Sequence, residues 1–274
     1  MAIPISAEFV EKYNQPGPRY TSYPTVPAWK QKFGHDEYVE ALHELNGRPD
    51  DEIAVYLHVP FCAKACHYCG CNMVVTHEKD EVTAYLDRLE REISMVTDII
   101  GKERRVVQMH WGGGTPNYLK NEQVERVLAM FREHFTIVPG AEVALEIDPR
   151  IATPDQTAFL MEAGFNRISL GVQDFDPRTQ KAIGRMQGRD KTLKIYHSCR
   201  DAGFEGVNLD LVYGLPGQTR ESFQDTLKQI IELRPDRVAC FSYAHVPWVR
   251  PNQELVDTTI MLTGYEKFQL FQLT

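Results

Sequence analysis

The feature that most limits the fold of this chain is a repeated alternation of short β-rich runs with helix-like segments. The β-rich runs are Ile53–His58, Val106–His110, Glu142–Ile147, Arg167–Gly171, Gly206–Val212 and Arg237–Ser242. The segments between them carry apolar residues at three-and-four spacing, which predicts amphipathic helices. These segments are Val82–Val96, Asn121–Phe135, Asp155–Ala163, Arg189–Ala202 and Glu221–Leu233. Strand and helix in alternation predict an α/β fold built on a parallel sheet.

Two architectures fit this alternation, an open doubly wound sheet and a partial barrel. The runs are rich in Val, Ile and Leu, which is typical of strands covered on both faces. In either architecture, ligands bind at the carboxyl ends of the strands. Several polar or glycine-rich positions of this chain lie at the carboxyl ends of the predicted strands or just beyond them: His58, Trp111 with its glycines, Asp148, Gln173, Asp210 and His245. We therefore expect the functional site at that edge.

Composition and charge exclude several classes of protein. The 274 residues are 43% hydrophobic and 25% charged, which is typical of a globular chain and not of a disordered one. No run approaches the roughly 18–20 apolar residues that a bilayer requires, and the N-terminus lacks the basic start and apolar run of a secretory signal. We therefore expect a cytoplasmic protein that does not enter a membrane. The net charge of −8 argues against nucleic acid as a partner.

Four of the six cysteines fall within ten residues: Cys62, Cys66, Cys69 and Cys71. The cytosol keeps thiols reduced, so such a cluster predicts a metal site and not a disulfide framework. Cys199 and Cys240 stand alone in apolar surroundings. We expect these two to be small buried hydrophobic residues, as free cysteines commonly are.

The C-x3-C-x2-C spacing of Cys62, Cys66 and Cys69 lets three thiolates converge on one centre. On a [4Fe–4S] cluster, three protein thiolates leave one iron open to a small molecule, whereas most clusters are held by four cysteines. The alternative is zinc, with Cys71 or His67 completing four ligands. Structural zinc ligands usually come as two separated pairs, so a single loop favours the cluster.

The cysteine spacing, with Tyr68 before the third cysteine, resembles that of the radical S-adenosylmethionine (SAM) enzymes. Further motifs are similar to those of the oxygen-independent coproporphyrinogen III oxidase family. They are Cys71 in CGCN, RYTSYPT (Arg19–Thr25), HWGGGTP (His110–Pro116), EIDPR (Glu146–Arg150), GVQDF (Gly171–Phe175) and DLVYGLP (Asp210–Pro216). The likeness runs from about Glu8 to Val249, although that family continues well beyond Thr274.

The resemblance implies a partial (β/α)6 barrel with an extended N-terminal arm. We expect residues 1–49 to form the arm, 50–250 the radical SAM core, and 251–274 the start of an incomplete C-terminal region. The last residues, GYEKFQLFQLT, predict a helix with an apolar face and no capping signal at its end. This predicts a truncated chain that lacks a downstream domain; the alternative is a short docking tail.

The resemblance also implies the ligands. Cys62, Cys66 and Cys69 would bind three irons, and SAM would bind the fourth. The positions implied to contact one or two molecules of SAM are Tyr56, Tyr68, Gly113, Gly114, Thr115, Glu146, Gln173, Arg185, Asp210 and Ala244. Cys71 would act in catalysis near the substrate.

Several of these positions also have an ordinary structural interpretation. The three glycines could form a plain strand-to-helix turn, Glu146 could be an exposed strand-end carboxylate, and Arg185 could lie on a helix surface. Asp210, on an apolar strand, must meet either a ligand or a basic residue if it is buried.

The implied reaction converts two propionates of coproporphyrinogen III to vinyl groups, giving protoporphyrinogen IX. An electron donor such as flavodoxin or ferredoxin would reduce the cluster, and we expect a monomer. One rival is a haem chaperone of the same superfamily, which generally lacks both the CGC cysteine and the RYTSYPT arm. The other rival is a non-catalytic iron–sulfur or zinc-binding fragment.

Overall fold

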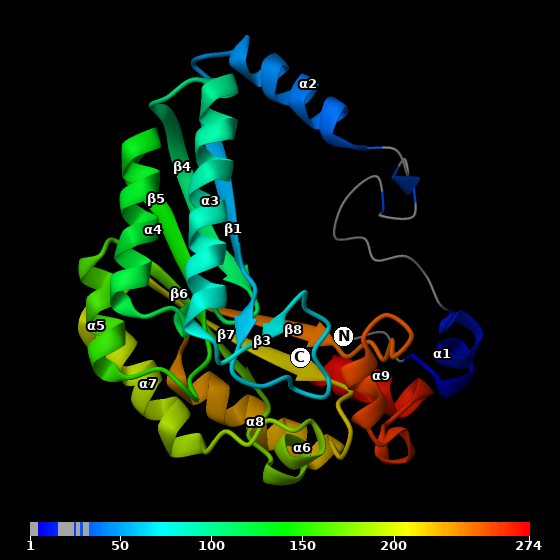
Figure 1. Ribbon diagram of the computed structural model, residues 1–274. Helices are drawn as coiled ribbons and strands as arrows, with labels where there is room; N and C mark the ends of the chain where they lie inside the picture. The colour runs from blue at the N-terminus through cyan, green and yellow to red at the C-terminus, as the bar shows by residue number, and fades with distance from the viewer. Residues whose placement is uncertain (1–4, 16–24, 26–27, 30–32) are drawn as a thin grey trace.

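The computed structural model describes residues 5–15, 25, 28–29 and 33–274. Six parallel strands form one sheet in the order β1-β4-β5-β6-β7-β8, so each strand lies beside the next one along the chain (Figure 1). They are β1 (Ile53–Val59), β4 (Arg104–Gly113), β5 (Phe135–Ile147), β6 (Arg167–Gln173), β7 (Gly206–Tyr213) and β8 (Arg237–Ser242). A doubly wound sheet would reverse its strand order part-way. The sequential order is that of a half-barrel, which confirms the predicted partial (β/α)6 fold.

Helices connect the strands and run along the outer side of the sheet (Figure 1). They are α3 (Lys79–Ile100), α4 (Asn121–His134), α5 (Pro154–Glu162), α6 (Pro177–Ala182), α7 (Arg189–Ala202) and α8 (Arg220–Leu233). The short α6 has no counterpart among the predicted segments. Its start is set by Asp176, whose carboxylate accepts hydrogen bonds from the N–H groups of Arg178 and Thr179, and by Pro177 at the first helical position.

The strands are not covered on both faces, and that expectation is wrong. In β6, Ile168, Leu170 and Val172 are buried against the helices, whereas Ser169 and Gly171 on the inner face are only half-buried. Side chains alternate across a strand, so the inner face of the half-barrel is left for polar residues. Trp111, which the sequence predicts at the site edge, instead lies fully buried in the core. Its ring packs edge-on against a phenylalanine of that core.

The region expected as the N-terminal arm contains two helices, α1 (Ala7–Tyr13) and α2 (His35–Asn46), which the sequence analysis does not predict. The Ser6 side chain caps α1 by accepting a hydrogen bond from the N–H of Phe9. The first helix contacts α9 and the second contacts α3. Of the RYTSYPT segment, only Thr25 belongs to the described residues.

The predicted last helix is present as α9 (Gly264–Leu273) and is preceded by two short 3-10 helices, η3 (Pro251–Leu255) and η4 (Thr258–Ile260). It packs against β7 and α8, with Leu270 fully buried. Lys267 donates a hydrogen bond to the carbonyl of Tyr243 at 2.7 Å. Within the part of the chain that the structure describes, no helix is long and apolar enough to cross a bilayer.

Candidate metal and cofactor site

The four clustered cysteines lie in one loop at the carboxyl end of β1. The loop begins in β2 (Phe61–Cys62) and ends at β3 (Val74–Val75), and these two short strands pair in parallel. The N–H of Val74 donates to the carbonyl of Pro60 at 2.8 Å, which closes the base of the loop. Cys66 is buried and Cys71 is exposed, while Cys62 and Cys69 are half-buried.

Cys69 and Cys71 form a hydrogen-bonded thiol pair. The Cys71 thiol and the Cys71 N–H, the latter 3.4 Å from Cys69 Sγ, donate to Cys69 and lower its pKa to about 6, although burial opposes the change. The same hydrogen bond, together with the negative charge of Cys69, raises the pKa of Cys71 above its ordinary value. Since the thiolate is the form that binds metal, these shifts make Cys69 the better metal ligand of the two thiols.

Cys62 lies beside Thr115, one of the residues predicted to contact SAM. Its Sγ is 3.2 Å from Thr115 Oγ1, at the end of β4. Burial raises the pKa of the Cys62 thiol, and the hydroxyl of Thr115 partly offsets that effect.

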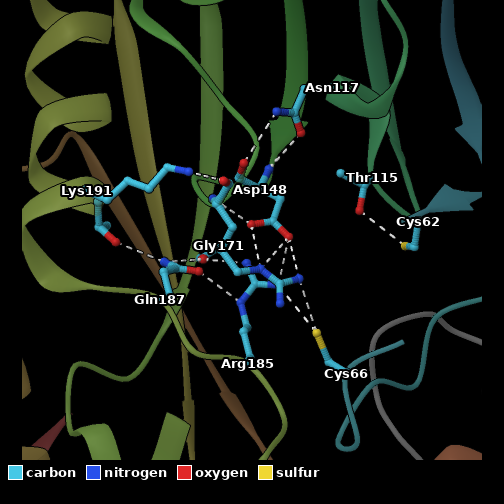
Figure 2. Close-up of polar contacts among 11 residues, drawn as sticks. Cys62, Cys66, Thr115, Asn117, Asp148, Gly171, Arg185, Gln187 and Lys191 are labelled. Atoms are coloured by element: carbon cyan, nitrogen blue, oxygen red, sulfur yellow. Dashed lines mark hydrogen bonds and ion pairs between the residues drawn. The ribbon is translucent and has the colours of Figure 1, made fainter. Parts of the chain in front are cut away.

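The third thiol, Cys66, faces two cations. Its Sγ lies 3.5 Å from Arg150 Nη2 and 3.7 Å from Arg185 Nη1. Both guanidinium groups also bind the buried carboxylate of Asp148, at 2.7 Å from Arg150 and 3.2 Å from Arg185. Figure 2 shows Arg185 beside Asp148 and Cys66. Burial disfavours an ionised Asp148, but the two cations outweigh it and hold its pKa below the ordinary value. Arg185 is therefore a buried residue and not a helix-surface arginine.

These donors fit a cluster held by three protein thiolates. The pKa of Cys69 is lowered, and the guanidinium groups of Arg150 and Arg185 offset negative charge at Cys66. In the described ranges, no three His, Cys, Asp or Glu side chains are arranged to hold a single metal ion. The support for a cluster therefore comes from the chemistry of the donors and from their sharing one loop.

Gly113 and Gly114 pack against the strand that leads into the cysteine loop. Gly113 has a φ of +119°, which favours glycine. A Cβ on Gly114 would lie within 3.0 Å of the carbonyl oxygen of Pro60. The structure thus gives these glycines a packing role, and their contact with a ligand stays a prediction.

A group of titratable side chains occupies the inner face of the half-barrel. Glu146 Oε1 lies 3.2 Å from His110 Nε2, and Tyr56 Oη lies 3.1 Å from His58 Nδ1. Burial raises the pKa of Tyr56, and the charge of Glu146 raises it further. Glu146 is therefore part of an electrostatic cluster and not an isolated strand-end carboxylate.

Asp210 belongs to the same face. Ser169 Oγ donates to its Oδ2 at 2.9 Å and Asn208 Nδ2 donates to its Oδ1 at 2.7 Å. Burial, with the charge of Glu146, raises the pKa of Asp210 to about 6 in spite of these donors. Among the described residues no ion pair includes Asp210, so the basic partner considered from sequence is not found.

The other candidates lie at the same edge. Gln173 is buried at the end of β6 with a φ of +68°, where the register with β7 shifts. Tyr68 is in the cysteine loop, and burial raises its pKa above the ordinary value. Ala244 is half-buried just after β8. Cys199 is fully buried as expected, whereas Cys240 is only half-buried.

Three comparisons with known proteins bear on this site. Residues 56–230 match the model of the radical SAM superfamily. The chain belongs to the radical SAM superfamily. It is 40% identical over 265 residues to oxygen-independent coproporphyrinogen III oxidase of Escherichia coli and 39% identical over 272 residues to that of Synechocystis. The solved structure of the E. coli enzyme superposes with a TM-score of 0.87, covering 96% of this chain at 39% identity.

This radical SAM chain is thus a homologue of coproporphyrinogen III oxidase, as its motifs predicted. It spans only part of those relatives: 97% of this chain matches 57% of the E. coli protein, and 99% matches 58% of the Synechocystis protein. The superfamily implies a [4Fe–4S] cluster and SAM, and the three-thiol loop lies in the matched region.

Proposed function

We propose that Cys62, Cys66 and Cys69 bind a [4Fe–4S] cluster whose fourth iron takes SAM, and that the site performs the coproporphyrinogen III oxidase reaction. The observation that carries the proposal is the three-thiol loop at the carboxyl end of β1, in a half-barrel that superposes on the E. coli enzyme. When bound, the cluster and SAM would supply a 5′-deoxyadenosyl radical, which removes a hydrogen from the β-carbon of a substrate propionate.

The protein residues would hold and shield this chemistry. Arg150 and Arg185 place two positive charges at Cys66, which favours a negatively charged cluster. The half-exposed carboxylates of Glu146 and Asp210 on the inner face are suited to accept hydrogen bonds from ribose hydroxyl or ammonium groups of SAM. Cys71 is exposed and lies two residues beyond the third ligand, so its thiol is free to act as a hydrogen or electron relay near the substrate.

The proposed substrate is coproporphyrinogen III, in which two propionates each lose CO2, a hydrogen atom and one electron to become vinyl groups. The electron that begins each turnover would come from a flavodoxin or ferredoxin, and an external acceptor would take the electron released by the substrate. These assignments rest on similarity to relatives of which this chain covers a little more than half.

The proposal is tested by anaerobic reconstitution with iron and sulfide, followed by reduction in the presence of SAM. We expect 5′-deoxyadenosine from the native chain and none from Cys66→Ser, with Cys199→Ser as a matched control that forms product. Adding coproporphyrinogen III should then yield protoporphyrinogen IX. A reconstituted chain that leaves SAM intact would contradict the proposal, and one that cleaves SAM but binds haem without oxidising the porphyrinogen would support the chaperone instead.

A further inference from the structure

A segment far from the cysteines in sequence holds the backbone of their loop. Asn252, in η3, directs its side-chain Nδ2 at three carbonyl oxygens of the loop: Cys66 at 3.0 Å, His67 at 3.2 Å and Cys69 at 3.0 Å. The next residue, Gln253, donates from Nε2 to the carbonyl of Tyr68 at 2.8 Å. Two neighbouring amide side chains therefore bind four consecutive loop carbonyls.

The Gln253 amide is fixed in position by its surroundings. Gln253 is only 1% exposed, and its Oε1 accepts a hydrogen bond from the N–H of Val246 at 2.6 Å, which fixes its orientation. Arg250 adds a further contact, donating from Nε to the carbonyl of Gly70 at 2.8 Å. A buried amide donor with a fixed orientation, such as that of Gln253, loses little side-chain entropy on binding a carbonyl, so it is suited to set a loop conformation.

The loop has little internal support at the same positions. Between Cys66 and Cys69 the backbone makes one hydrogen bond within the loop, from the N–H of Cys69 to the carbonyl of Cys66 at 3.2 Å. The N–H of His67 is bound from outside, by the carbonyl of Ile183 at 2.9 Å. The spacing of the thiols therefore depends on groups outside the loop.

We propose that Asn252 and Gln253 are positioning residues that hold the cysteine loop in the conformation that captures the cluster. This inference rests on the proposed function, since it assigns the two amides to the assembly of the same site. Neither side chain contacts a thiol in the structure, so each would act through the loop backbone.

The test compares Asn252→Asp and Gln253→Glu with the native chain. Each variant keeps nearly the same shape but replaces a donating NH2 by an oxygen, which cannot donate to a carbonyl when ionised. Leu255→Ala is the matched control, because Leu255 lies in the same η3 helix and is 66% exposed. Far-UV circular dichroism and thermal melting of the metal-free proteins establish that each variant folds.

Two measurements then follow: the rate at which reconstituted protein loses iron to a chelator, and the rate at which Cys66 and Cys69 of metal-free protein are alkylated. Losing two or more hydrogen bonds should speed both rates by about tenfold in Asn252→Asp, with a smaller increase in Gln253→Glu and none in Leu255→Ala. Rates equal to those of the native chain in both variants would overturn the inference while leaving the proposed function intact. A native chain that takes up no iron–sulfur cluster would instead overturn the proposed function. The alkylation rates would still report whether the two amides hold the loop.

Discussion

Arg185 Nη1 lies 3.7 Å from Cys66 Sγ, although 119 residues separate the two in sequence. Arg185 is buried, and its other nitrogens bind the Gly171 carbonyl at 2.9 Å and Gln187 Oε1 at 3.0 Å. The guanidinium is therefore fixed in place by β6 and by the loop between α6 and α7. This contact joins the cysteine loop to the far half of the barrel.

Replacing Arg185 should destabilise the metal-free fold. Arg185→Leu leaves the buried Asp148 with Arg150 alone, and we expect the free energy of unfolding to fall by about 3 kcal/mol, since breaking a buried ion pair is costly. Arg185→Lys keeps the charge but not the planar fork, so about half that loss is expected. Urea unfolding of the metal-free protein measures both, and a Leu variant as stable as the native chain would contradict the network described for Asp148.

Because Gly114 packs closely on the cysteine loop, an added methyl group should destabilise the fold more at Gly114 than at Gly70. Gly114→Ala should lower the free energy of unfolding by about 2–3 kcal/mol, because the added methyl meets the backbone of Pro60. Gly70→Ala is the control: Gly70 lies in the same loop, and a Cβ there meets nothing within 4 Å, so a change below about 0.5 kcal/mol is expected. Equal effects at the two positions in urea unfolding would show that the packing assigned to Gly114 is wrong.

Asp210 should make the stability depend on pH. Its folded pKa of about 6 lies above the ordinary 3.8, so the native state holds the proton more tightly than the unfolded chain does. The stabilisation is full below about pH 4 and is lost as pH rises through 6, with a total of about 3 kcal/mol. Asp210→Asn removes this dependence. Subtracting the variant's unfolding free energy from the native value at each pH isolates the effect, and a difference that stays constant from pH 4 to pH 7 would refute it.

The sequence predicted the half-barrel strands because most of these runs are rich in Val, Ile or Leu and all but the last are followed by a predicted helix. It could not choose between barrel and doubly wound sheet, since strand order depends on tertiary packing that periodicity does not record. Nor could the sequence show that helices cover only one face of the sheet. In the structure the other face carries half-buried polar side chains, among them Ser169 and Asn208, which both donate hydrogen bonds to Asp210.

At the site, the cysteine spacing predicted that three thiols share one loop, because residues so close in sequence must also lie close together in space. Asp148 and Arg150 lay in a recognised motif without a stated role, and the structure places both beside Cys66. Asn252 and Gln253 carried no signal at all, because an amide acquires its role only from the carbonyls that the fold brings to it.

The central claim is that three protein thiolates, and not four, hold the cluster. It is tested most directly by electron paramagnetic resonance of the reduced, anaerobically reconstituted chain and of Cys71→Ser, each with and without SAM. We expect a [4Fe–4S] signal in both proteins, changed by SAM in both, and none in Cys62→Ser, Cys66→Ser or Cys69→Ser. Bound zinc in place of iron, a cluster lost in Cys71→Ser, or a signal that SAM leaves unchanged would contradict it.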